Sequence, residues 1–227
     1  MTAERRLVVA TGNAHKVSEL RALLPGVPLV GLDAFAPWTP PNEDAPDFVG
    51  NACIKALAGY AHTGLPCLAD DSGLSVDALG GAPGVHSARY VDGTDADRRQ
   101  ALLRALSPVT RLEARTGRFT CVLAVAGLPP ETTLLLPAGV EVVRGCVVAT
   151  GTCEGLIVFE DHGAHGFGYD ALFAPVEVGA GPDGRRSTFG ELDAATKNAL
   201  SHRGRAVARL APFLNAWCGL DPAARNA

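Results

Sequence analysis

The chain has 227 residues, of which 47% are hydrophobic, and its formal net charge is −4. This is enough apolar material for one sizeable core. The acidic balance argues against a nucleic-acid polymer as a partner, but a few local cations would suffice to bind a small anionic ligand. No apolar stretch reaches the roughly 20 residues of a membrane-spanning helix, and no signal peptide is recognised, so we expect a cytoplasmic protein without a membrane partner.

Six cysteines are spread along the sequence without forming a C-x-x-C pair. Reduced and mostly buried thiols are expected from such spacing in a cytosolic protein. Cys153, His162 and His165 would supply only three zinc ligands, and their spacing matches no zinc module. No zinc site is therefore predicted.

The first half of the sequence predicts strands alternating with helices. In order, the predicted elements are a strand over 6–11, a helix from about Ala14 that is stopped by Pro25-Gly26, a strand over 27–32, a loop over 33–47 and a helix from Phe48 to about His62. Asp47 is placed to cap the second helix. Strand, tight turn and helix open most nucleotide-binding α/β folds.

A pair of neighbouring acids, Asp70 and Asp71, stands at the end of a short apolar run at 65–68. We expect the strand to end there and a flexible turn to follow through Ser72-Gly73. Because adjacent side chains on extended backbone point to opposite faces, one carboxylate should face the interior and the other project from the strand end. A carboxylate there suits Mg²⁺ or the activation of a water, although a solvated turn has the same sequence.

The second half predicts a run of antiparallel strands followed by helix. Its predicted elements are a glycine-rich loop over 80–84, a helix over 94–106, strands over 118–126, 132–136, 140–150 and 155–159, and a helical region over 191–218. Thr94 and Asp97 are in capping-box positions, and Ser201 is placed to break and cap the last helix. Residues 221–227 are expected to fray. The pattern is α/β with a mixed, twisted sheet.

Four further segments carry candidate binding residues. Thr11, Asn13 and Lys16 lie at a predicted strand-to-helix turn, where free N–H groups and the lysine would attract phosphate, although this is not a P-loop. An ordinary capped helix with a solvated lysine remains the alternative. Glu43 lies in the acidic loop before the second helix, where Asp44 and Asp47 would serve as well.

The remaining two segments are rich in glycine, aromatic and cationic residues. In Gly166-Phe167-Gly168-Tyr169-Asp170, the first aromatic can stack on a nucleobase, unless it is simply a core aromatic beside a turn. Lys197, His202 and Arg203 offer donors to a purine carbonyl, or else form a charged helix end.

In combination these motifs make the chain resemble the inosine triphosphate pyrophosphatase family, also called dITP/XTP pyrophosphatases. The resemblance runs from Arg6 to about Leu210. It rests on Thr-Gly-Asn-x-x-Lys at 11–16, Glu43, Asn51-Ala52, Ala-Asp-Asp-Ser-Gly-Leu at 69–74, the stretch from Gly80 to Tyr90, Gly-Phe-Gly-Tyr-Asp at 166–170 and Lys-Asn-x-x-Ser-His-Arg at 197–203.

The resemblance implies a single domain over residues 1–227, with a long mixed twisted sheet, flanking helices and two lobes around a central cleft. Family members use Mg²⁺ to hydrolyse a purine nucleoside triphosphate between its α and β phosphates. They prefer hypoxanthine and xanthine bases, so they remove deaminated purines from the nucleotide pool. A homodimer is common.

The resemblance also implies a role for each matching residue. Asp71 would be the catalytic carboxylate, and Asp71 and Glu43 would hold the metal. His202 and Arg203 would contact the purine 6-keto group. The substrate-binding residues would be Thr11, Gly12, Asn13, Ala14, His15, Lys16, Ser72, Phe167, Gly168, Tyr169, Asp170, Lys197, His202 and Arg203.

Two departures from the family pattern flank residues 166–170, the base loop, in which the resemblance implies that Phe167 to Asp170 line the base pocket. Asp161-His162-Gly163 replaces the usual Pro-Arg-Gly, and Ala171 follows Asp170 where proline is common. Both put the base preference in question more than the hydrolysis. The alternatives are a related pyrophosphatase for other modified or pyrimidine nucleotides, a nucleotide-binding module without turnover, and a plain structural domain.

Overall fold

The computed structural model describes residues 5–133 and 136–220, and the chain divides into two compact units. Unit 1 takes the described residues up to Asp71, Cys121–Gly151 and those from Arg205 onward. Unit 2 takes Ser72–Thr120 and Thr152–Gly204. The predicted frayed tail, 221–227, lies outside the described residues.

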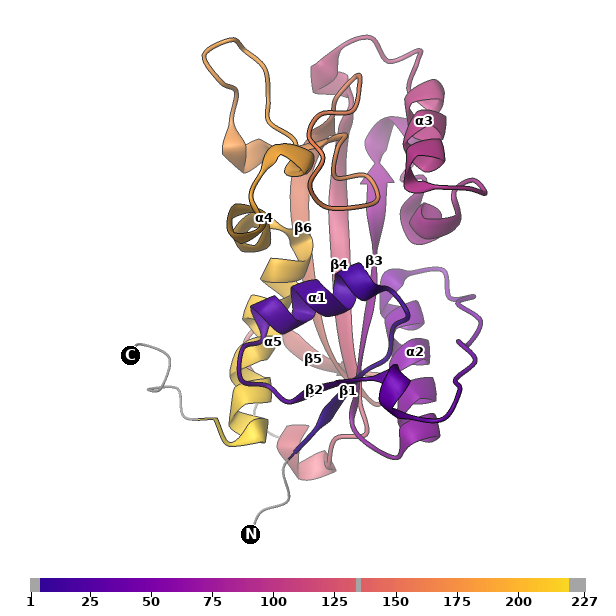
Figure 1. The fold of residues 1–227 in the computed structure, drawn as a ribbon, viewed down its shortest axis with the longest axis vertical. Coiled ribbons are helices and arrows are strands. Elements are labelled where there is room, and N and C mark those ends of the chain that lie inside the picture. Colours follow the sequence, from indigo (N-terminus) through magenta and orange to yellow (C-terminus); the bar gives the residue numbers. More distant parts are fainter. Residues whose placement is uncertain (1–4, 134–135, 221–227) are drawn as a thin grey trace. The chain divides into compact units, whose positions relative to one another are not determined.

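Five helices and seven strands are found in the described residues (Figure 1). The helices are α1 (Ala14–Leu23), α2 (Phe48–Thr63), α3 (Asp95–Ala105), α4 (Ala194–Leu200) and α5 (His202–Cys218). The strands are β1 (Leu7–Val9), β2 (Leu29–Gly31), β3 (Cys67–Val76), β4 (Thr116–Ala126), β5 (Val140–Val143), β6 (Cys146–Ile157) and β7 (Phe173–Pro175).

All seven strands belong to one mixed sheet, as the sequence predicts. The order is β2-β1-β3-β4-β6-β5, and β7 also pairs with β6. β1 is parallel to both β2 and β3, whereas β6 is antiparallel to β5 and β7. The first half of the chain thus forms crossovers through helices, and the second half forms hairpin-like pairs.

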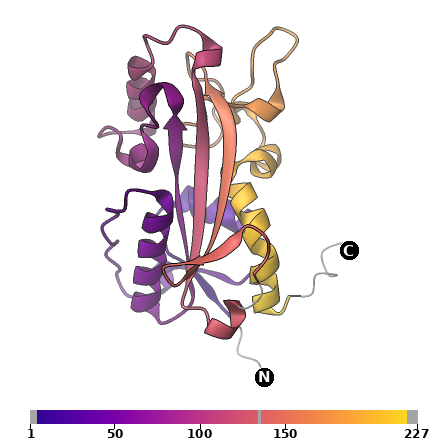
Figure 2. The same cartoon turned by 180° about the vertical axis from the view of Figure 1, so that it is seen from behind.

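In unit 1, helices cover both faces of the sheet (Figure 1). Leu7 and Val9 of β1 pack in a core with α1 and α5, while Val8 between them packs in another core with α2. Residues of β1 are almost completely buried, which explains why the strand is a continuous apolar run. Figure 2 shows α2 and α5 from behind, with the β5–β6 hairpin between them.

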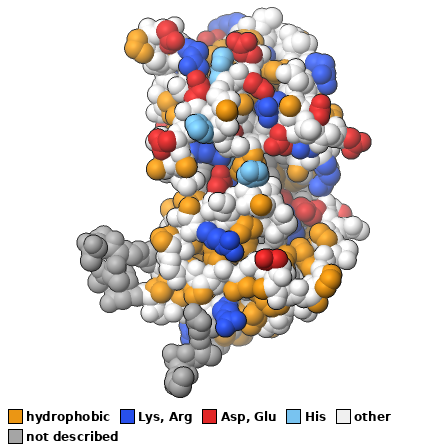
Figure 3. All heavy atoms as spheres, in the orientation of Figure 1, with side chains coloured by type: hydrophobic (Ala, Val, Ile, Leu, Met, Phe, Trp, Pro, Cys, Tyr) orange, Lys and Arg blue, Asp and Glu red, His pale blue; other side chains and the backbone are white. Residues whose placement is uncertain are grey.

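Unit 2 has its own aromatic core. Phe119, Phe173 and Phe189 pack with ring centroids 4.7 to 6.3 Å apart, and Leu102 of α3 packs against the same cluster. On the face shown in Figure 3, charged side chains of both signs are interspersed over unit 2, whereas hydrophobic side chains gather in the unit that carries α1.

The predicted helix caps are confirmed. The Asp47 carboxylate accepts from the Gly50 N–H at 2.6 Å, and Ser201 Oγ accepts from the Gly204 N–H at 3.0 Å. Thr94 and Asp97 form the expected capping box. Local hydrogen bonding therefore positions these helix starts.

The predicted turn after Asp71 is wrong. β3 continues unbroken through Ser72 and Gly73 to Val76. Leu74 and Val76 are fully buried in the core of unit 2, and the Leu74 N–H donates to Ser87 Oγ at 2.9 Å. Burial and sheet pairing outweigh the turn preference of an Asp-Ser-Gly sequence.

The strands predicted at 140–150 and 155–159 are also wrong in their limits. Arg144 and Gly145 both have positive φ, 52° and 77°, and form a two-residue turn between β5 and β6. This is the backbone geometry of a tight hairpin, but arginine rarely adopts it, so the sequence does not reveal the turn. After the turn, β6 runs without interruption to Ile157.

The strand predicted at 132–136 is not confirmed either. Pro130–Thr133 form a short 3-10 helix, and residues 134–135 lie outside the described part. Five of the six cysteines are buried, as expected. Among the described helices, none combines the length and apolar character that crossing a membrane requires.

Candidate active site

The predicted site residues fall into two groups, one in each unit. In unit 1, Asp70 and Asp71 meet lysines from the helices on the two faces of the sheet. We call Lys16, Glu43, Lys55, Asp70 and Asp71 the carboxylate cluster. In unit 2, we call Phe167, Asp170, Lys197, His202 and Arg203 the aromatic cluster.

The interior acid is Asp70. Its side chain is fully buried and forms an ion pair with Lys16 Nζ of α1, at 2.6 Å from Oδ1. The Asp70 Oδ2 atom lies 3.3 Å from Cys121 Sγ. The Lys16 ammonium, which the sequence predicts to attract phosphate, is therefore paired with a buried carboxylate.

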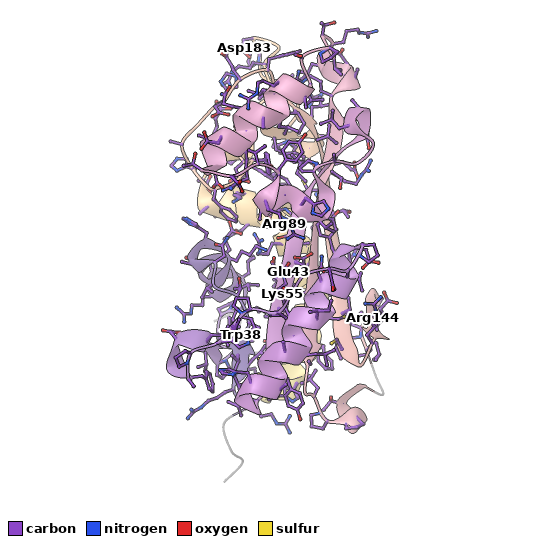
Figure 4. The ribbon with its side chains drawn as sticks, turned by 90° about the vertical axis from the view of Figure 1, so that its right-hand side faces the viewer. Trp38, Glu43, Lys55, Arg89, Arg144 and Asp183 are labelled. Atoms are coloured by element: carbon purple, nitrogen blue, oxygen red, sulfur yellow. The ribbon has the colours of Figure 1, made fainter. Side chains whose placement is uncertain are left out.

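Asp71 points to the opposite face of the sheet, as the alternation along a strand predicts. Its Oδ1 atom accepts from Lys55 Nζ of α2 at 2.6 Å, and the same ammonium lies 3.1 Å from Glu43 Oε2. Figure 4 shows Glu43 and Lys55 together beside α2. A lysine therefore links the two carboxylates for which the sequence predicts a shared metal.

Burial sets the acidity of this group. Burial raises the pKa of Asp71 to about 6, against the opposing influence of Lys55 and Lys16. Burial also acts to raise the pKa of Glu43, but Lys55 outweighs it and holds that pKa below its usual value. The proton near neutral pH therefore resides more readily on Asp71, which is the behaviour of a group able to accept a proton from water.

The carboxylate cluster fits a hard divalent cation. Asp71 Oδ2 is buried and accepts no hydrogen bond from the described residues. Mg²⁺ in proteins is often held by one or two carboxylates, with substrate phosphates and waters completing its shell. Asp71 and Glu43 provide two carboxylates of this kind. Residues 5–133 and 136–220 contain no cluster of three or more His, Cys, Asp or Glu side chains suited to a metal.

The predicted phosphate-binding segment forms the start of α1. Asn13 caps the helix, and its Oδ1 atom accepts from the N–H groups of His15 and Lys16 at 3.0 and 3.2 Å. Two of the helix N–H groups are thus already bonded. Thr11, Gly12 and Ala14 line a pocket of about 760 Å³ together with the other half of α1 and residues 31–40, including Trp38 (Figure 4).

In unit 2, Phe167 lies against two cations. Lys197 Nζ is 4.9 Å from the centre of its ring, and Arg203 Cζ is 5.8 Å away. Asp170 holds this arrangement, because its Oδ2 accepts from Lys197 Nζ and from the Phe167 N–H, both at 2.8 Å. Asp170 therefore holds the loop in this conformation, in addition to its predicted role in lining the base pocket.

Arg203 and His202 start helix α5 and are both buried. Arg203 Nη2 donates to Ser72 Oγ at 3.0 Å. The His202 ring stacks on Phe119 with a centroid distance of 4.6 Å and an interplanar angle of 10°. The structure thus brings Phe167, His202 and Arg203 of unit 2 together, with the His202 ring packed on the core residue Phe119.

Tyr169 and Gly168 differ from the other residues of the predicted base loop. Tyr169 is 4% exposed, and its hydroxyl donates to the Ser87 carbonyl at 3.0 Å within the core. Burial raises the pKa of that hydroxyl, so it stays neutral. Gly168 is bonded through its backbone to α3 and has a φ of 61°.

Sequence reasoning missed Lys55. The signal was present, because Lys55 follows Ala52 and precedes Gly59 on the helix stripe that faces the sheet. A lysine on a buried stripe needs a carboxylate partner. Asp95 and Arg99 of α3 were also missed. Both are bonded to the backbone of Gly168 in the base loop, and the sequence of α3 itself does not indicate this contact.

Comparison with known proteins places the chain in a family. The Ham1 family matches residues 7–213. This chain belongs to the Ham1 family. A dITP/XTP pyrophosphatase of Symbiobacterium thermophilum is 45% identical to this Ham1 chain over 209 residues, 91% of this chain and 93% of the relative. The resemblance found in the sequence is therefore confirmed.

Solved Ham1 structures agree with the fold. A HAM1 protein from Coxiella burnetii is 36% identical, with a TM-score of 0.74 over 93% of this chain and 99% of the other. A nucleoside-triphosphatase, dITP/XTP pyrophosphatase, from Mycobacterium abscessus is 40% identical, with a TM-score of 0.66 over 91% and 99%.

Proposed function

We propose that this Ham1 protein is a nucleoside triphosphate pyrophosphohydrolase that converts ITP, dITP and XTP to the monophosphate and pyrophosphate. The observation that carries the proposal is the buried Asp71, bonded to Lys55 and beside Glu43. The similarity to relatives named dITP/XTP pyrophosphatase supports the choice of substrate.

In the proposed reaction, Asp71 takes the proton of the attacking water. A pKa raised to about 6 by burial makes it a stronger base than an exposed aspartate, while it remains ionised at neutral pH. Lys16 and Lys55 reduce the repulsion between a triphosphate and the acids around it. Asp71 and Glu43 would hold Mg²⁺, which when bound neutralises phosphate charge and helps to generate the nucleophile.

The aromatic cluster would bind the base. Phe167 offers a stacking surface, and Arg203 and Lys197 carry hydrogen-bond donors. A donor aimed at a 6-keto oxygen meets another donor in adenine, and a buried donor without a partner costs about 1–3 kcal/mol.

The test is product analysis with ITP, dITP, XTP, GTP, ATP, dTTP and UTP, each with and without Mg²⁺. Pyrophosphate release from the hypoxanthine and xanthine nucleotides, dependent on Mg²⁺, is expected. Orthophosphate as the product would overturn the reaction type. A preference for dTTP or UTP would support the alternative pyrophosphatase, and binding without turnover would support a nucleotide-binding module.

The resemblance also motivates proposals on assembly, location and role. We infer a homodimer, a cytoplasmic location and a role in removing deaminated purines from the nucleotide pool. Light scattering on the purified protein tests the first, since a mass near 23.4 kDa would correspond to a monomer and contradict it. Fractionation of cells tests the second, and an accumulation of ITP or XTP on deletion tests the third.

A further inference from the structure

The loop that presents Phe167 is rich in glycine with positive φ. Gly163, Gly166 and Gly168 have positive φ values of 78°, 77° and 61°. Three such glycines within six residues have few intrinsic backbone preferences, so the residues themselves do not fix one loop conformation. Contacts outside the loop must therefore determine where the Phe167 ring lies.

Helix α3 holds the loop at Gly168 from both sides of that residue. Asp95 Oδ2 accepts from the Gly168 N–H at 2.7 Å, and Arg99 Nη1 donates to the Gly168 carbonyl at 3.0 Å. Asp95 and Arg99 are four residues apart, so they share one face of the helix. The backbone N–H and carbonyl of Gly168, the residue directly after Phe167, are thus both bonded to a helix.

Ion pairs hold the two α3 side chains in place. Arg99 Nε lies 2.9 Å from Asp161 Oδ2, where the loop begins, and Arg98 Nη2 lies 2.7 Å from Asp95 Oδ1. The Arg99 side chain is 18% exposed. A single arginine therefore connects the beginning of the loop to the residue directly after Phe167.

We propose that Asp95 and Arg99 are positioning residues that set the place of Phe167 and thereby the affinity for the base. Phe167 itself is fixed on its other side by Asp170, which accepts its N–H, and by the two cations beside its ring. This inference rests on the proposed function for its substrate. It adds that α3, which carries no substrate-binding residue, determines base recognition.

The test compares Arg99→Gln with the wild type in two assays. For the pyrophosphate-releasing reaction with ITP and Mg²⁺, the KM is expected to rise about tenfold while kcat changes less than twofold. The inhibition constant of inorganic triphosphate, which has no base, is expected to stay within twofold of the wild-type value. Hydrogen exchange of residues 163–169 in the ligand-free protein is expected to accelerate.

Matched variants complete the experiment. Arg104→Gln changes an exposed arginine of the same helix and should leave all three quantities unchanged. Asp161→Asn removes the ion pair but leaves the Arg99 donor, so it should have a smaller effect of the same kind. Arg99→Lys, which retains a donor, should recover part of the wild-type KM.

Three results would overturn the inference: an unchanged KM for ITP, an equal loss of affinity for inorganic triphosphate, or unchanged hydrogen exchange in the loop. Failure of the proposed function is distinct from these. In that case the wild type would release no pyrophosphate from any nucleotide, and accelerated exchange in Arg99→Gln would still support the positioning contact.

Discussion

The carboxylate cluster and the aromatic cluster are built in different ways. In the former, both acids of β3 are paired by lysines of α1 and α2, all on regular elements. In the latter, Phe167 lies on a glycine-containing loop and is held by side chains that bond its backbone. Apart from Glu43, which lies in a loop, the charged groups of the first cluster are thus on helices and a strand, whereas the position of Phe167 depends on contacts that can be altered one at a time.

The largest effect expected from breaking the carboxylate cluster comes from Asp71→Asn. Without a base to accept the proton of water, pyrophosphate release from ITP should fall by about 10²–10⁴-fold. Steady-state assays at saturating Mg²⁺ measure this. The amide keeps an oxygen for Lys55, so nucleotide binding followed by thermal shift should persist, and a wild-type rate would refute the catalytic assignment.

Lys55→Met tests whether the lysine also stabilises the fold. Removing it leaves Asp71 and Glu43 close together without their shared cation. Breaking a buried ion pair costs about 3–5 kcal/mol, so the free energy of unfolding in urea should fall by that order. Lys16→Met, which breaks the other buried pair, is the matched variant, and a loss below 1 kcal/mol in both would contradict the assigned pairing.

The pKa of Asp71 predicts a pH dependence in the metal-free protein. Folding raises this pKa from 3.8 to about 6 because of burial, so the folded state binds the proton more tightly than the unfolded state. The contribution to stability is therefore complete below pH 3.8 and is lost as the pH rises to about 6, by roughly 3 kcal/mol at most. Urea unfolding of the wild type and of Asp71→Asn, both with a chelator and at several pH values, isolates the contribution of Asp71. If the free energies of unfolding of the two proteins changed in parallel with pH, the assignment would be contradicted.

The aromatic cluster should show a smaller effect confined to binding. Phe167→Ala removes a base-stacking surface worth about 1–3 kcal/mol, so the KM for ITP should rise about 5- to 150-fold. Phe159→Ala, which changes a 51% exposed phenylalanine outside the cluster, is the control. A fall in kcat with an unchanged KM would show that Phe167 acts in the chemical step instead.

The errors of sequence reasoning also differ between regions. Caps at Asp47, Thr94 and Ser201 were predicted correctly, because each depends on hydrogen bonds within a few residues. The end of β3 was predicted wrongly, because Leu74 and Val76 are kept in the strand by a core formed from distant parts of the chain. The hairpin turn at Arg144 was missed since its residue types do not favour its backbone conformation.

The two departures around the base loop have structural outcomes that the sequence could not supply. Asp161 pairs with Arg99, a residue 62 positions away. Ala171 accepts from the His162 N–H through its carbonyl, and its backbone packs against Gly190. Loop residues were located by their motif, but their anchoring partners lie on other elements.

For this protein, the sequence by itself determined the alternating α/β pattern, the helix starts and the residue types available for chemistry, because all of these follow from local periodicity and local hydrogen bonds. Only the tertiary structure decided which charges meet. Lys16 pairs with Asp70, 54 residues further along the chain, and the ammonium of Lys55 lies between Asp71 and Glu43. These pairings depend on which helix covers which face of the sheet. Since these charges are buried, leaving any of them unpaired would cost free energy of folding.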